Sequence, residues 1–337
     1  MPLRKIEINN MIRHIIDNAF FQKRILDYNI KKKVHSFPSL FQIQTINSCN
    51  GNCIMCPNSQ NKNFKPELMP NKLFEKIVNE ISKEKSKHTY IYTYLQNEPL
   101  MDNDIFKKIK LIKDISNGRI KTGLVTNGTL FNKEKIKELE ESEVDILLFS
   151  LDAFSEETYN KIRKGFNFKT VLNNLNNVII SDYNGILRVG FIKQKDNISE
   201  LKDFKKFWKK NRLWPHISYI HNRSGDLYNF DKICLNKKDT PFLVRLKHNI
   251  YNNIVKCCEN TLVTFNILFN GDVILCCNDY SKKLIFGNVK KSTIKKIWNS
   301  DKYQTIRKLL YNKSYEKISV CSNCSKIRNI SFTKIMT

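Results

Sequence analysis

Three cysteines lie close together near the amino terminus. Cys49, Cys53 and Cys56 stand in the stretch Ser-Cys-Asn-Gly-Asn-Cys-Ile-Met-Cys, directly after a strand-like segment. Iron–sulfur clusters are held by cysteine thiolates, normally four for a four-iron cube. Three thiolates on one loop would leave one iron open, and an open iron can bind a small molecule as a chelate. The spacing therefore predicts a cluster that takes part in chemistry rather than in electron storage alone.

A structural zinc site is the alternative for these three cysteines. Zinc in such a site normally has four protein ligands, often on paired Cys-x-x-Cys arms. No histidine or acidic residue stands close by in the sequence, although Cys234 could supply a fourth ligand in space. The lack of a local fourth ligand favours the iron–sulfur interpretation.

A second set of cysteines lies towards the carboxyl terminus. Cys258 and Cys276 flank a hairpin pattern, and Cys321 and Cys324 form a Cys-x-x-Cys pair. Four thiolates are enough to saturate a four-iron cube. A four-cysteine zinc site is the alternative here.

Two further cysteines, Cys257 and Cys277, adjoin proposed ligands of the second set. Adjacent residues on a strand point to opposite faces, so each neighbouring pair should supply one ligand. We expect Cys258 and Cys276 to be those ligands, but Cys257 or Cys277 could replace them. Spare thiols are often buried as small hydrophobic side chains.

The composition of the chain limits its class and location. With 337 residues and 41% hydrophobic residues it is long enough for one large domain and a small one. No apolar run approaches the ~20 residues needed to cross a bilayer, and no signal-peptide pattern is present. We therefore expect a cytoplasmic protein without a membrane span. In that compartment thiols stay reduced, so ten cysteines indicate metal binding rather than disulfides.

The net charge of +26 has two interpretations. One is attraction to nucleic acid, to an anionic membrane or to an acidic substrate. The other is compositional bias, because lysines are scattered over the whole chain. No aromatic–basic motif accompanies the charge, so we do not expect nucleic-acid binding.

The elements that position the cysteines follow a regular order. Residues 6–28 form an amphipathic pattern with a basic face, which favours a helix packed on its own domain over one lying on a membrane. From residue 41 to about 221, strand and helix patterns alternate. The strands are expected at 41–47, 89–95, 120–126, 145–151, 186–193 and 215–220, and the helices near 70–84, 103–114, 132–141, 168–180 and 198–210.

Six β-α repeats predict an α/β fold with a parallel sheet, either open or closed into a full or partial barrel. In barrels, catalytic groups gather at the carboxyl ends of the strands. After a connector, residues 256–337 change character: a hairpin is expected around Asn270-Gly271, followed by a helix that contains Ile294, Trp298 and Ile306 and then by the closing cysteine pair.

The motif Cys-x3-Cys-x2-Cys after an early strand resembles that of the radical S-adenosylmethionine (SAM) superfamily. In that family the position of Met55 lies where the backbone approaches adenine. The stretch Leu-Gln-Asn-Glu-Pro-Leu at 95–100 resembles the family's Gly-Gly-Glu-Pro motif, with Gln96 and Asn97 in place of the glycines. The resemblance implies that Glu98 binds the methionine ammonium group of SAM.

Three more residues are implied to contact SAM. Asn127 follows the third strand, Ser150 ends the fourth, and Arg163 lies on the next helix. In relatives with this arrangement the serine and arginine hold the SAM carboxylate, a role that suits the planar guanidinium. The resemblance also implies that the parallel sheet is a partial (β/α)6 TIM-like barrel.

The carboxyl-terminal cysteines resemble the auxiliary-cluster domains called SPASM and Twitch. The stretch Ile285-Phe-Gly-Asn-Val and the later Ile297-Trp298 are also characteristic of those domains. No cysteine follows Cys324, which indicates one auxiliary cluster. The implied organisation is an amphipathic helix and linker at 1–36, a radical SAM partial barrel at 37–225, a connector at 226–255 and a small α+β auxiliary-cluster domain at 256–337.

The resemblance implies two four-iron clusters and SAM as cofactors. Reductive cleavage of SAM would give a 5′-deoxyadenosyl radical that abstracts hydrogen from the substrate. The auxiliary cluster would accept the remaining electron, so that the net reaction is a two-electron oxidation. We expect a small polar substrate of the sugar or aminocyclitol type, and a reducing partner such as flavodoxin or ferredoxin. The alternatives are a peptide- or protein-modifying maturase and, in another class, a non-catalytic iron–sulfur or nucleic-acid-binding protein.

Overall fold

The computed structural model describes residues 19–60, 65–235 and 257–324. Most of the helix expected at 6–28 lies outside these ranges. The described part of the helix runs over 19–31, three residues farther than expected. It packs on the fold through Phe21, Ile25 and Tyr28, which are buried. The connector expected at 226–255 also lies mostly outside the described residues.

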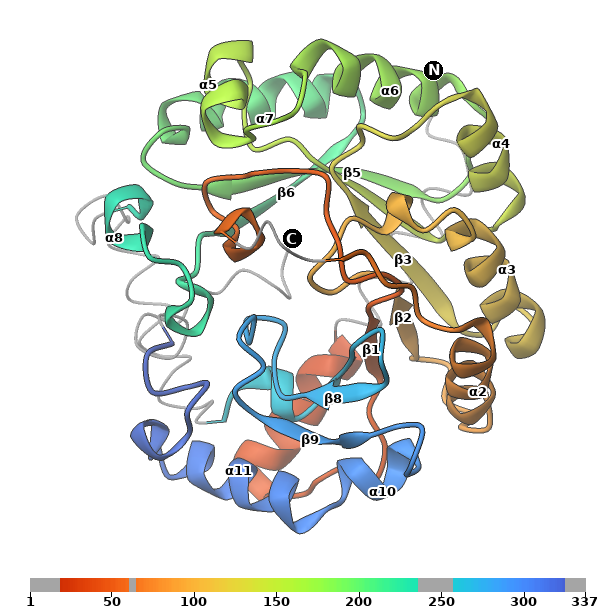
Figure 1. Cartoon of the computed structure of the whole chain (residues 1–337), viewed down its shortest axis with the longest axis vertical. Coiled ribbons are helices and arrows are strands. Elements are labelled where there is room, and N and C mark those ends of the chain that lie inside the picture. The colour runs from red at the N-terminus through yellow and green to blue at the C-terminus, as the bar shows by residue number, and fades with distance from the viewer. Residues whose placement is uncertain (1–18, 61–64, 236–256, 325–337) are drawn as a thin grey trace.

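The six β-α repeats form one parallel sheet with helices on its outer side (Figure 1). All six strands and the five intervening helices lie close to where the sequence places them. The short helix α5, which ends just before Arg163, lies outside the helix ranges expected from the sequence. The bounds are β1 (Leu40–Ile43), α2 (Asn71–Ser82), β2 (Tyr90–Tyr92), α3 (Ile105–Ser116), β3 (Lys121–Thr126), α4 (Lys133–Glu141), β4 (Ile146–Ser150), α5 (Glu156–Ile162), α6 (Phe168–Ile180), β5 (Ile186–Lys193), α7 (Leu201–Lys210) and β6 (Trp214–Tyr219).

Local sequence explains why these helices begin where they do. Asn132, Ser155 and Asn167 precede α4, α5 and α6, and each side chain accepts a hydrogen bond from the backbone amide three residues later. Such caps satisfy amides that have no partner within the helix. The apolar faces of the helices then pack on the sheet, as in α2, where Phe74, Ile77 and Ile81 are buried.

Short helices fill several of the connections between these elements. Those in the barrel half are η1 (Pro57–Gln60), η2 (Pro99–Met101), η3 (Ile198–Glu200), η4 (Arg223–Gly225) and α8 (Phe230–Ile233). Two more lie near the carboxyl-terminal cysteines, η6 (Glu259–Thr261) and η7 (Tyr315–Lys317).

The carboxyl-terminal region continues the same sheet. The expected hairpin is confirmed: β7 (Thr264–Ile267) pairs antiparallel with β8 (Asp272–Ile274), and Gly271 in the turn has a φ of 89°. A third strand, β9 (Ile285–Asn288), was not expected. The strand order is β6-β5-β4-β3-β2-β1-β7-β8-β9, because β7 pairs in parallel with β1.

The helix expected after the hairpin is two helices. α10 (Ile294–Trp298) ends before Ser300, whose side chain caps α11 (Asp301–Tyr311). Phe265 of β7 contacts Phe41 of β1, with ring centroids 6.1 Å apart. One hydrophobic core therefore takes side chains from both halves of the chain, and the domain boundaries expected from the sequence remain a prediction.

Among the residues described, no helix is long and apolar enough to cross a membrane. The cytoplasmic location remains a prediction.

Candidate cluster and cofactor sites

The first three cysteines lie on the loop that follows β1, at the carboxyl ends of the parallel strands. Two backbone hydrogen bonds fix this loop to the end of α5: Asn52 N to Lys164 O (3.0 Å) and Ile54 N to Ile162 O (3.0 Å). Gly51 lies against the Phe166 ring so closely that a Cβ atom would overlap it. Contacts with a distant part of the chain therefore position this loop.

The donor set of this loop fits an iron–sulfur cluster. Burial raises the pKa of the Cys53 thiol to about 11, and burial also raises the pKa of Cys49. A raised thiol pKa means that an unpaired thiolate is unfavourable at this buried site. The positive charge of cluster iron stabilises the thiolates, because cysteine ligands bind metal in the deprotonated form. Met55, beside Cys56, is 3% exposed and packs with Cys53.

Glu98 is buried beneath the cysteine loop, a few residues after β2. Its carboxylate accepts hydrogen bonds from Thr126 Oγ1 (2.6 Å), Asn127 N (2.7 Å) and Leu100 N (3.1 Å). Desolvation by burial raises its pKa, while these bonds favour the charged form. The carboxylate thus orders the turn after β3 whether or not it also binds an ammonium group.

Asn127 and Ser150 lie at the carboxyl ends of β3 and β4. Asn127 Nδ2 donates to Asn50 Oδ1 (2.8 Å), which joins this strand end to the cysteine loop. Ser150 is half-buried and lies next to Gly190 in the sheet. The structure therefore gathers Met55, Glu98, Asn127 and Ser150 at one end of the sheet, although their contacts with SAM remain a prediction.

Arg163 follows α5 and is 7% exposed. Its Nε donates to Asp152 Oδ2 (2.9 Å), Nη2 donates to the same oxygen, and Nη1 lies 3.8 Å from Cys53 Sγ. Asp152 stands two residues after Ser150 in the sequence, and nothing in the sequence indicated its pairing with Arg163. Asp152 has a φ of 61° and is completely buried, both of which are unusual for aspartate. Neither property can be read from the sequence.

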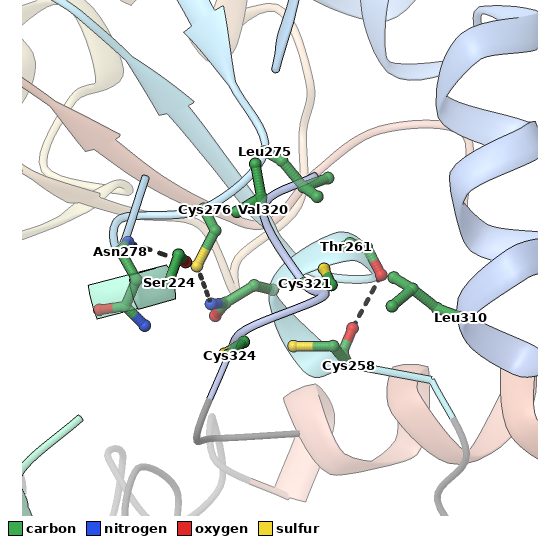
Figure 2. A pocket seen from close by; sticks show the side chains of 11 residues that line it. Ser224, Cys258, Thr261, Leu275, Cys276, Asn278, Leu310, Val320, Cys321 and Cys324 are labelled. Carbon is green, nitrogen blue, oxygen red and sulfur yellow. Dashed lines mark hydrogen bonds between the residues drawn. The ribbon is translucent and has the colours of Figure 1, made fainter. Parts of the chain in front are cut away.

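The second set of cysteines surrounds one cavity in the carboxyl-terminal region (Figure 2). Cys258, Cys276, Cys321 and Cys324 all line it, and no carboxylate, imidazole or cationic side chain of the described residues does. Asn260 Nδ2 lies 3.1 Å and the backbone N of Asn278 3.4 Å from Cys276 Sγ. A lining of four thiols with N–H donors aimed at sulfur suits a four-iron cluster.

The other three cysteines lie in three separate places. Cys257 Sγ is 3.4 Å from Thr261 Oγ1 within the hydrophobic core. Cys277 packs against Leu95, Leu268 and Ile274. Cys234 packs at the edge of the side chains around Cys53 and Met55. The cavity lining therefore favours Cys258 and Cys276 over their neighbours as ligands, and the spare thiols do not form a third set.

The zinc alternatives have no geometric support. Within the described ranges, no three histidine, cysteine, aspartate or glutamate side chains are grouped so that they could hold a single metal ion. A four-iron cube is larger than one ion, and its thiolate ligands lie farther apart.

Two family models match the chain. The radical SAM superfamily model matches residues 43–207, and the SPASM iron–sulfur cluster-binding domain matches residues 257–325. Together with the parallel sheet and the two sets of thiols, these matches define an enzyme that uses SAM and iron–sulfur clusters. The chain belongs to the radical SAM superfamily and has a carboxyl-terminal SPASM domain. It binds SAM, and each of the two matched regions binds one four-iron cluster.

Individual relatives are distant or cover only part of the chain. An uncharacterised protein of Methanocaldococcus jannaschii is 35% identical over 134 residues, which is 40% of this chain and 41% of that protein. The S-adenosyl-L-methionine-dependent 2-deoxy-scyllo-inosamine dehydrogenase of Niallia circulans is 19% identical over 86% of this chain and 93% of that protein.

Solved structures show the same fold. The structure of BtrN in complex with AdoMet and 2-DOIA has a TM-score of 0.60 at 18% identity, covering 88% of this chain and 95% of that one. Streptococcus suis SuiB bound to the precursor peptide SuiA has a TM-score of 0.66 at 16% identity, covering 91% of this chain and 74% of that one.

Proposed function

We propose that this radical SAM enzyme oxidises a small polar substrate of the sugar or aminocyclitol type by two electrons. The observation that carries the proposal is the cavity lined by Cys258, Cys276, Cys321 and Cys324. Four thiolates leave no iron open for substrate, so the auxiliary site suits electron acceptance. When bound, SAM and the first cluster supply a hydrogen-abstracting radical, and the second cluster supplies the electron acceptor.

The residues of the chain hold and orient these groups. Cys49, Cys53 and Cys56 are the proposed ligands of the first cluster. We assign Glu98 to the ammonium group of SAM, and Ser150 and Arg163 to its carboxylate. Arg163 is held by Asp152, so it offers a fixed donor rather than a mobile one, which favours orientation of the cofactor.

The likeness to the 2-deoxy-scyllo-inosamine dehydrogenase supports the small-molecule substrate, because the chain covers 93% of that protein. Peptide modification is the second candidate, because SuiB in its peptide complex shares the fold. A reducing partner of the flavodoxin or ferredoxin type remains a prediction.

The test is anaerobic turnover with both substrate classes. The reconstituted enzyme is incubated with SAM and a reductant, together with a panel of aminocyclitols and sugars or a panel of peptides. Formation of 5′-deoxyadenosine beyond the substrate-free background identifies the class. With a deuterated substrate, deuterium should enter 5′-deoxyadenosine, and the unlabelled product should be about two mass units lighter than its substrate.

Two results would contradict the proposal. Stimulation by peptides alone would favour the maturase, and a product of unchanged mass would indicate isomerisation instead of oxidation. A variant with Cys321→Ala and Cys324→Ala serves as the control, because it should still cleave SAM without releasing oxidised product.

A further inference from the structure

One short loop contacts both cluster sites. We call residues 276–280 the bridging loop. Cys276 at its start lines the cavity of the second site. At its end, the Tyr280 hydroxyl lies 3.8 Å from Cys56 Sγ in the first site. Within the described part of the chain, the two proposed sites are therefore joined by five consecutive residues.

The bridging loop is held in place from the barrel side by Gln96. Its Nε2 donates to the backbone oxygens of Cys277 (3.1 Å) and Asp279 (3.0 Å). The backbone oxygen of Gln96 accepts from Asn58 Nδ2 (2.7 Å), just after the cysteine loop. Gln96 is 5% exposed, and a glycine at this position could make neither side-chain bond.

Arg223 holds the bridging loop from the other side. Its Nη1 donates to Asn278 Oδ1 (2.8 Å). Arg223, Ser224 and Gly225 have consecutive φ values of 51°, 59° and 90°. Two non-glycine residues in the left-handed region cost energy and persist only where the surrounding structure enforces them. The turn after β6 therefore positions the Arg223 guanidinium beside the bridging loop.

Chemistry fixes the direction of the contact between Tyr280 and Cys56. An iron-bound cysteine is a thiolate and can only accept, so the hydroxyl must donate. Hydrogen bonds to cluster sulfur are among the factors that set a reduction potential, and they favour the reduced, more negative state.

We propose that Tyr280 tunes the first cluster: its hydrogen bond to Cys56 raises the reduction potential of that cluster, and the bridging loop makes this bond depend on whether the second site is filled. The inference rests on the proposed assignment of Cys56 and Cys276 as ligands. Filling the second site fixes Cys276 and thereby the start of the loop. Loss of the second cluster removes this anchor at the start of the loop and weakens the bond at Cys56.

The first test replaces Tyr280 by Phe, which removes the hydroxyl and keeps the ring. The potential of the first cluster is measured by redox titration monitored by electron paramagnetic resonance. If the whole net contribution of a hydrogen bond, about 0.5–1.5 kcal/mol, favours the reduced state, the reduction equilibrium changes about twofold to tenfold, and a tenfold change is about 59 mV for one electron. We expect a shift to lower potential with iron content unchanged.

Tyr183→Phe is the matched control. Tyr183 lies before the amino-terminal end of β5, away from the cluster loops, so this variant should keep the wild-type potential. An unchanged potential in Tyr280→Phe, with both clusters loaded, would overturn the inference.

The second test asks whether the second site acts through Tyr280. Cys324→Ala should lower the potential of the first cluster in the same direction. Adding Tyr280→Phe to Cys324→Ala should then change little, because coupled residues are non-additive. Fully additive shifts would show that the bridging loop does not carry the effect. Failure of the ligand assignment is distinguishable, because Cys276→Ala would then retain the iron of the second site, whatever the potential of the first cluster.

Discussion

The Arg163 guanidinium lies between the Asp152 carboxylate and the Cys53 thiol, with Nε 2.9 Å from Oδ2 and Nη1 3.8 Å from Sγ. Asp152 is itself fixed, because its Oδ1 accepts from Ile192 N (2.6 Å) and its backbone oxygen from Asn197 Nδ2 (2.8 Å). The end of β5 thereby fixes Asp152, and Asp152 in turn positions the Arg163 guanidinium beside the first cysteine loop.

We therefore expect Asp152→Asn to destabilise the protein markedly. Removing one partner of a buried ion pair typically costs about 3–5 kcal/mol, and Arg163 would also lose its orientation. Urea denaturation gives the change in the free energy of unfolding, and calorimetry gives the affinity for SAM. Glu156→Gln is the control, because its pair with Lys169 is solvent-exposed and should contribute less than about 1 kcal/mol. Equal effects of the two changes would contradict a buried positioning role.

Replacement of Glu98 by Gln tests a residue with two functions. The amide can still accept hydrogen bonds, but its NH2 group would face one of the donors, Asn127 N or Thr126 Oγ1. Leaving such a donor unpaired costs about 1–3 kcal/mol. We expect weaker SAM binding together with a lower unfolding free energy, while iron at the second site is retained. Normal SAM affinity in this variant would refute its assignment to the ammonium group.

The cysteines of the first loop should be essential for cleavage of SAM. Changing Cys49, Cys53 or Cys56 to Ala should abolish formation of 5′-deoxyadenosine, measured by chromatography after anaerobic reconstitution. Cys234→Ala is the control, because its thiol packs beside this site without belonging to the trio. Loss of cleavage in Cys234→Ala would make Cys234 a fourth functional cysteine.

Neighbouring cysteines in the second set provide a matched comparison. Cys258→Ala and Cys276→Ala should each remove up to about half of the iron, since two four-iron clusters hold about eight. Cys257→Ala and Cys277→Ala should keep it, because neither lines the cavity. Iron analysis and the visible absorption of the clusters measure both results. The opposite pattern would reassign the ligands.

Gln96→Gly introduces the family residue and should loosen the bridging loop. Two hydrogen bonds to the loop would be lost, about 0.5–1.5 kcal/mol each. Hydrogen exchange should show faster amide exchange over 276–280. Asn97→Gly is the control, since Asn97 Oδ1 accepts a local hydrogen bond from Leu95 N and leaves the contacts of Gln96 in place. Unchanged protection of the loop in Gln96→Gly would show that other contacts hold it.

The sequence alone determined the order of the elements and the sets of cysteines. Apolar strand-like runs and helical periodicity located β1 to β6 and their helices, because central strands such as β3 are buried on both faces and each helix buries one face. Spacing within a loop is a local property, so Cys49, Cys53 and Cys56 could be recognised directly. The strand β9 was missed because its short segment contains a glycine and its pairing with β8 has an irregular register. The break between α10 and α11 was missed because its signal is one serine cap.

Only the tertiary structure decided which distant residues meet. Neither the parallel pairing of β7 with β1 nor the shared core has a local signal, since both depend on how the chain returns after more than two hundred residues. For the same reason the sequence left Cys258 and Cys276 unresolved against their neighbours, whereas the orientation of β8 and η6 turns these two thiols into the cavity. Gln96 appeared in the sequence as a departure from a glycine motif. The fold shows that its side chain holds the bridging loop, because the segments that follow β2 and β8 meet only once the sheet has formed.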